Sequence, residues 1–85
     1  MITFQDGDWI QVLGKKWVLK LRESTDEEWL ILTGGGIKGL VCPGENGGFM
    51  YVLTDKGDPA ETFVHELHEI FLTEMGRLLN EAGTG

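Results

Sequence analysis

A short segment in the C-terminal third of the sequence gathers residue types that bind metal ions. Residues 65–69 read His-Glu-Leu-His-Glu within an apolar stretch. On a helix, side chains three and four positions apart share one face, so His65, His68 and Glu69 project together. Imidazole nitrogens and carboxylate oxygens are both zinc ligands. The segment therefore predicts a divalent-metal site, for Zn²⁺, with His65 and Glu69 as ligands and His68 as a third candidate.

The same segment is a variant of a hydrolase signature. In H-E-x-x-H, two histidines one turn apart bind zinc and the glutamate between them acts as the general base. Here the pattern is H-E-x-x-E, so Glu69 takes the place of the second histidine and Glu66 is the candidate catalytic base. Zinc would acidify a bound water, Glu66 would take its proton, and the hydroxide would attack a carbonyl. The alternative is that these side chains form only a solvated stripe beside the core.

A long C-terminal helix is expected to carry these residues. Asp58 suits the N-cap, Pro59 the first helical position, and Glu61 completes a capping box. Because apolar residues then recur at helical spacing, we predict a helix over about residues 59–82 that lays one face on a sheet. These residues are Phe63, Val64, Leu67, Ile70, Phe71, Met75, Leu78 and Leu79.

The preceding part of the chain, to about residue 53, reads as strands. Gly14-Lys15 separates two runs rich in β-branched and aromatic residues, which indicates a hairpin. Thr25 and Glu28 have the spacing of a capping box, which favours one helical turn there. We expect strands at 9–13, 16–22, 29–32, 37–42 and 49–53. Strands followed by a helix predict a single α+β domain over residues 1–85, with a small, mostly antiparallel sheet of three to five strands packed against one long C-terminal helix.

The chain also resembles a known group of proteins. The features that carry the resemblance are a hairpin around residues 12–17, Gly39-x-x-Cys42, the strand at 49–53 and the helix opening at residues 61–69. Together they are similar to small zincin-like bacteriophage proteins that are distantly related to the ImmA/IrrE metallopeptidases. The resemblance implies that His65 and Glu69 are metal ligands and Glu66 the general base of a peptide-bond hydrolase. His68 stands where that group has an apolar residue.

A third protein ligand is less easily assigned. Zincins draw it from beyond the signature helix, yet no further histidine follows Glu69. The candidates are His68, Cys42, Asp55 or Asp58, a residue from a second subunit, or none. Whether the chain is an enzyme therefore stays open, and independent proteolysis is not expected.

Composition narrows the range of partners. The chain has 14 acidic and 7 basic side chains and a net charge of −7, which argues against direct binding to nucleic acid and fits a basic protein surface. A single cysteine and the absence of a signal or membrane segment favour the cytoplasm, which is that of a bacterial host if the chain is phage-encoded. We expect a protein or peptide partner and no membrane, and a homodimer is compatible with the sequence.

Two functional interpretations therefore remain. The first is a zincin-like, phage-type minidomain with a metal site on its C-terminal helix. The second is a non-enzymatic acidic interaction protein, such as a phage inhibitor of a host defence or regulatory protein. The second would use acidic and aromatic surface residues, for which Trp9, Trp17 and Trp29 are candidates if they do not all lie in the core.

Overall fold

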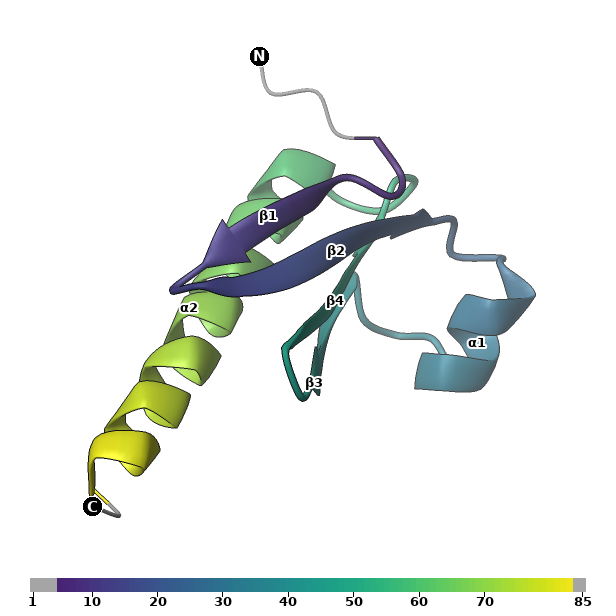
Figure 1. The fold of residues 1–85 in the computed structure, drawn as a ribbon. Helices are drawn as coiled ribbons and strands as arrows, with labels where there is room; N and C mark the ends of the chain where they lie inside the picture. The colour runs from purple at the N-terminus through teal and green to yellow at the C-terminus, as the bar shows by residue number, and fades with distance from the viewer. Residues whose placement is uncertain (1–4, 84–85) are drawn as a thin grey trace.

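The part of the chain that the structure describes folds into one sheet and two helices (Figure 1). The computed structural model describes residues 5–83. Its elements are β1 (Trp9–Val12), β2 (Lys15–Arg22), α1 (Glu27–Thr33), β3 (Gly39–Gly44), β4 (Gly47–Leu53) and α2 (Pro59–Gly83). The predicted α+β fold is confirmed, since a four-stranded sheet packs against a long C-terminal helix.

The sheet has the strand order β1-β2-β4-β3. β1 and β2 form the predicted antiparallel hairpin, and its turn holds Leu13 and Gly14 at φ values of 49° and 85°. β3 and β4 form a second antiparallel hairpin. The two hairpins join through β2 and β4, which run parallel. The sheet is therefore mixed, although two of its three strand pairs are antiparallel.

The strand predicted at residues 29–32 is wrong, because these residues belong to α1. Asp26 is the N-cap and its side chain accepts a hydrogen bond from the Trp29 backbone N–H, at 3.2 Å. Gly34 closes the helix at a φ of 73°, where its N–H bonds the carbonyl of Leu30. A short apolar run fits a strand or a helix equally well, and here the caps decide. The predicted capping box began one residue too early, at Thr25.

The two helices lie on opposite faces of the sheet, and β4 is buried between them. Met50 and Val52 pack against Ile70 of α2, in one cluster with Trp17 and Leu19. The alternate residues of β4, Tyr51 and Leu53, pack against Trp29 of α1 on the other face. Of the three tryptophans, Trp17 and Trp29 are core residues and Trp9 is 57% exposed.

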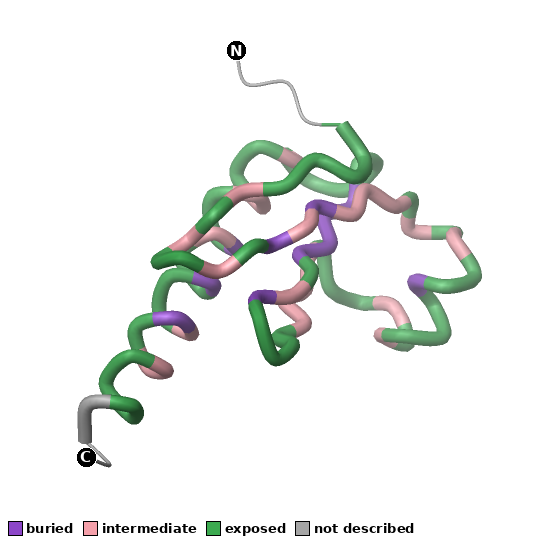
Figure 2. Tube along the Cα trace, in the orientation of Figure 1, coloured by how far each residue is buried: buried purple, intermediate pink, exposed green. Residues whose placement is uncertain are grey.

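α2 begins where the sequence predicts. The Asp58 side chain accepts a hydrogen bond from the Ala60 N–H at 3.0 Å, and its carbonyl accepts one from the Thr62 N–H. With 25 residues, α2 is about 37 Å long, whereas the eight residues of β2 span about 27 Å. Its last turns therefore run past the sheet, where Figure 2 shows mostly exposed positions. Among the described residues, neither helix is long and apolar enough to cross a membrane.

Candidate functional site

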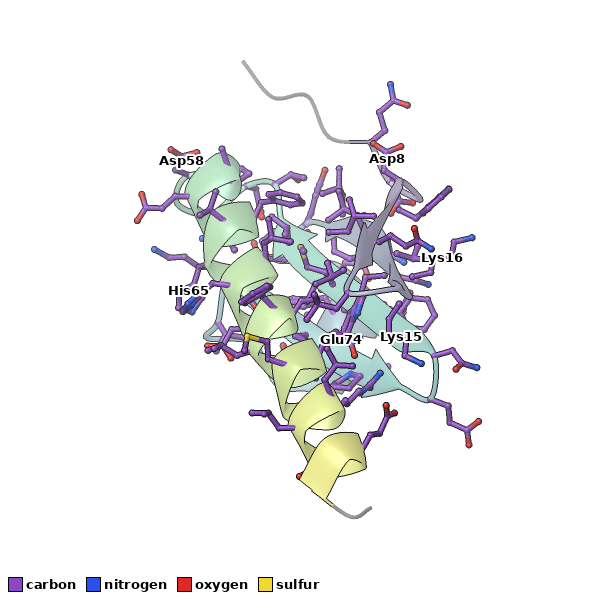
Figure 3. All side chains as sticks on the ribbon, turned by 60° about the vertical axis from the view of Figure 1, so that its left-hand side comes forward. Asp8, Lys15, Lys16, Asp58, His65 and Glu74 are labelled. Atoms are coloured by element: carbon purple, nitrogen blue, oxygen red, sulfur yellow. The ribbon has the colours of Figure 1, made fainter. Side chains whose placement is uncertain are left out.

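The predicted metal-binding residues lie in the second and third turns of α2. His65, His68 and Glu69 are exposed, whereas Glu66 is buried with 8% of its surface exposed. In Figure 3 the His65 side chain points away from the sheet. The structure brings His65 and Glu66 together, with Nε2 and Oε1 separated by 4.0 Å. Glu69 lies near enough for its charge to influence Glu66.

Glu66 is positioned by a close approach between α2 and β3. A Cβ atom added to Gly39 would lie 2.8 Å from Thr62 Cγ2 and 3.0 Å from Glu66 Cγ, so glycine is what lets the helix approach. Burial raises the pKa of Glu66, with His65 lowering that pKa and Glu69 raising it by smaller amounts. A carboxylate with a raised pKa is suited to taking up a proton, which is the role predicted for Glu66.

The other residues considered as a third ligand lie elsewhere. Cys42 packs on the face of the sheet opposite to α2, and burial raises the pKa of its thiol. Asp55 accepts hydrogen bonds from the backbone and hydroxyl of Ser24, which lower the pKa of its carboxyl. Asp58 caps α2. Within residues 5–83, no three His, Cys, Asp or Glu side chains are grouped so that they could hold a metal ion.

Comparison with known proteins identifies no relative of this chain. No protein-family model matches the sequence, and comparisons with curated proteins and with solved structures give no significant match. The resemblance to zincin-like phage proteins therefore stays a prediction that rests on the residues themselves. The same holds for the roles of His65, Glu66 and Glu69.

Sequence reasoning missed a second buried glutamate, Glu74, which is 1% exposed. Its Oε2 accepts a hydrogen bond from Trp17 Nε1 at 2.7 Å, and Arg77 Nη1 lies 3.3 Å from its Oε1. Arg77 also donates to the carbonyl of Gly44, the last residue of β3. Figure 3 shows Glu74 between the helix and the sheet. The available signal was its position four residues after Ile70, on the apolar stripe of the helix.

A large apolar surface lies on the side of α2 that the sheet leaves uncovered. Its side chains are between 39% and 67% exposed. A contiguous exposed apolar patch of this kind marks interaction sites in soluble proteins. We call it the apolar face of α2, and it comprises Val64, Phe71, Leu72, Met75, Leu78 and Leu79.

A second exposed surface lies on the sheet, beside α1. Trp9 and Phe49 are 57% and 43% exposed there. Lys16 Nζ lies 4.9 Å from the ring centre of Trp9, and Lys20 Nζ lies 4.8 Å from that of Phe49. Each ring thus has a lysine ammonium over one face. The aliphatic part of each lysine side chain covers apolar surface of the ring. The apolar face of α2 has no such cover, so it is the stronger candidate for a binding surface.

Proposed function

We propose that this protein is a non-enzymatic interaction protein that binds a helical protein partner through the apolar face of α2. The observation that carries the proposal is the exposure of Phe71, Leu72, Met75, Leu78 and Leu79 on one side of a single helix. Burying apolar surface contributes about 25 cal/mol per Å². A partner that covers the exposed apolar surface of α2 would therefore gain binding free energy.

The shape of the surface specifies the partner. A straight helix presents a narrow ridge, and a second amphipathic helix fits such a ridge by inserting its side chains between those of the first. Phe71 and Met75, one turn apart, supply the large side chains that dominate binding energy at interfaces. The setting in this proposal is the bacterial cytoplasm, which the single cysteine and the resemblance to phage proteins favour.

The proposal is tested by comparing the wild-type protein with Met75→Glu, which places a charge in the middle of the surface. A partner purified on the wild-type protein should bind the variant at least about tenfold more weakly, as expected for a central interface residue. The matched control is Ile31→Glu on α1, because Ile31 is an equally apolar residue that is 78% exposed away from α2. Equal binding by the wild type and Met75→Glu would overturn the proposal.

A second candidate function, a metal site, is favoured by one specific observation. His65 and Glu66 meet at 4.0 Å, and the charge of Glu69 acts on Glu66 at the same place. We propose His65 and Glu69 as zinc ligands, with His68 on the neighbouring exposed turn and Glu66 as the base. The third ligand would come from His68 or from a bound partner.

Zinc titration separates this candidate from the first. Stoichiometric zinc binding by the untagged protein, lost in both His65→Ala and Glu69→Ala, would support the metal site. Absence of binding at micromolar zinc would remove it and leave the interaction proposal intact, because the apolar face of α2 contains neither residue.

A further inference from the structure

The exposed side of α2 has heptad spacing. Val64, His68, Phe71, Met75 and Leu78 follow one another at intervals of 4, 3, 4 and 3 residues. This 3.5-residue repeat is the pattern by which one helix packs along another. A different set of residues on the same helix contacts the sheet and its turn, namely Glu66, Ile70, Glu74 and Arg77. α2 therefore has one face occupied by its own sheet and one face suited to a second helix.

We propose that a second copy of this chain occupies the apolar face of α2, with the two helices packed antiparallel about a twofold axis. This inference rests on the proposed function, and it identifies the helical partner as a second copy of the chain. A twofold interface requires a surface that is complementary to itself, and a heptad seam meets that requirement. The five seam positions contain no Asp or Glu. A basic partner would therefore find no opposite charge within the seam, whereas a second copy needs none.

The available surface is large enough for a stable dimer. The six side chains of the apolar face are 39% to 67% exposed, which corresponds to roughly 500 Å² of accessible surface per copy. Full pairing would bury about 1,000 Å² in total, which is the least that a specific interface needs. The seam spans the same turns of α2 that contact the sheet, but it lies on their other side, where its side chains are exposed and a second helix can approach.

The antiparallel orientation follows from two features of the helix. Antiparallel packing places the positive end of each helix dipole beside the negative end of the other. It also pairs Phe71 with Met75 of the second copy and His68 with Leu78 of the second copy, so that each polar His68 meets an apolar side chain. Parallel packing would instead stack His68 on His68. This register places the twofold axis at position 73, so Leu72, on the flank of the seam, lies close to Leu72 of the second copy.

The first test is the mass of the untagged protein in solution, measured by analytical ultracentrifugation at up to about 100 µM, where even a micromolar Kd populates a dimer. The wild type and Ile31→Glu should be dimers. Met75→Glu and Leu79→Glu should be monomers with unchanged circular dichroism, and the second variant, at a 67% exposed position, keeps the test valid if the first disturbs folding. His68→Leu should tighten the dimer roughly tenfold, because it removes a polar residue from an apolar seam.

Cysteine cross-linking tests the orientation, in a Cys42→Ala background that removes the single native cysteine. Leu72→Cys should form an intermolecular disulfide readily and Met75→Cys should not, because only position 72 meets its own copy in the antiparallel register. The reverse result would overturn the antiparallel orientation.

The outcomes also separate this inference from the proposed function. A monomeric wild type that binds a different protein, with Met75→Glu abolishing that binding, would overturn the second copy as occupant and support the binding surface. A dimer that Met75→Glu leaves intact would overturn the inference in the same way, since the contact would lie elsewhere. A monomer whose partner binding ignores Met75→Glu would overturn both.

Discussion

Two buried glutamates on one helix differ in how well their carboxylates are paired. Glu66 and Glu74 both project from α2 toward the sheet, and both have less than a tenth of their surface exposed. Glu74 accepts a hydrogen bond from Trp17 and is paired with Arg77. Within the described part of the chain, the one ion partner of Glu66 is His65, at 4.0 Å, and burial raises the pKa of Glu66.

The difference separates a structural carboxylate from one that is available for chemistry. A buried charge that is paired and hydrogen-bonded fixes the elements around it, and Glu74 thereby ties α2 to β2. A buried carboxylate without a strong partner destabilises the fold, and such groups concentrate at functional sites. Glu66 is therefore the better candidate for proton transfer, and a substitution of Glu74 should destabilise the fold more.

The largest expected effect is that of Glu74→Ala. It leaves the buried Trp17 Nε1 without an acceptor and removes the ion partner of Arg77, which should lower the free energy of unfolding by about 3 kcal/mol. Urea unfolding followed by tryptophan fluorescence measures the loss. Glu69→Ala, at an exposed position on the same helix, should stay within about 0.5 kcal/mol of the wild type. Similar losses for both variants would contradict a structural role for Glu74.

Trp17→Phe tests the same network from the side of the sheet. The ring stays apolar, but the buried hydrogen bond to the Glu74 carboxylate is lost and Arg77 Nη1, at 3.3 Å, is the remaining donor to Oε2, which should cost about 1–3 kcal/mol. Trp9→Phe is the matched control, because Trp9 is 57% exposed. We expect the control to change the free energy of unfolding by less than about 0.5 kcal/mol.

Gly39→Ala tests the close approach that buries Glu66. The new methyl group would meet Thr62 Cγ2 at 2.8 Å, so we expect a loss of about 1–2 kcal/mol from overpacking. Gly76→Ala adds the same methyl group to α2 where nothing lies within 4 Å, and it should stabilise the helix by up to about 1 kcal/mol. Thermal unfolding of both variants should show melting temperatures that shift in opposite directions.

Glu66→Gln should have the smallest effect, and its sign should depend on pH. Burial raises the pKa of Glu66 above its ordinary value of 4.5, so folding disfavours the ionised form at neutral pH. The glutamine variant should therefore be more stable than the wild type at pH 7. That gain should fade as the pH falls through the raised pKa of folded Glu66, and it should be gone well below 4.5, where Glu66 is protonated in both the folded and unfolded states. A gain that is constant with pH, or equal to that of the exposed control Glu45→Gln, would contradict this reasoning.

Much of the fold was predictable, because the local patterns agree with it. The β1–β2 hairpin followed from a glycine between two strand-like runs, and the start of α2 from Asp58 and Pro59. The four apolar residues of 29–32 were misassigned because their pattern carries no period. Asp26 fixes the start of the helix through its side-chain hydrogen bond and Gly34 fixes the end through a positive φ, and neither is visible in the apolar run. The parallel pairing of β2 with β4 leaves no trace in sequence order.

The candidate site was predictable in part. Helical spacing predicted that His65, His68 and Glu69 project together, and all three are exposed on α2. The approach of His65 to Glu66, at 4.0 Å, was not part of that prediction. Burial of Glu66 was not predictable, since it depends on Gly39, which is far away in the sequence. The sequence pattern assigned all apolar residues of α2 to the face that packs on the sheet. Such a pattern does not show how much of the helix the sheet covers. Only the structure separates Ile70, which is buried, from Leu79, which is exposed.

The parallel pairing of β2 with β4 also sets the expected order of folding. Each hairpin closes locally and can form within about 1–10 µs. The pairing of Lys16 with Gly47 joins residues 31 positions apart, so the two hairpins must find each other across the α1 segment. At this junction a Cβ on Gly47 would lie 1.7 Å from the Lys16 carbonyl oxygen. A side chain at position 47 should thus leave the early β1–β2 hairpin intact and slow the later step that completes the sheet.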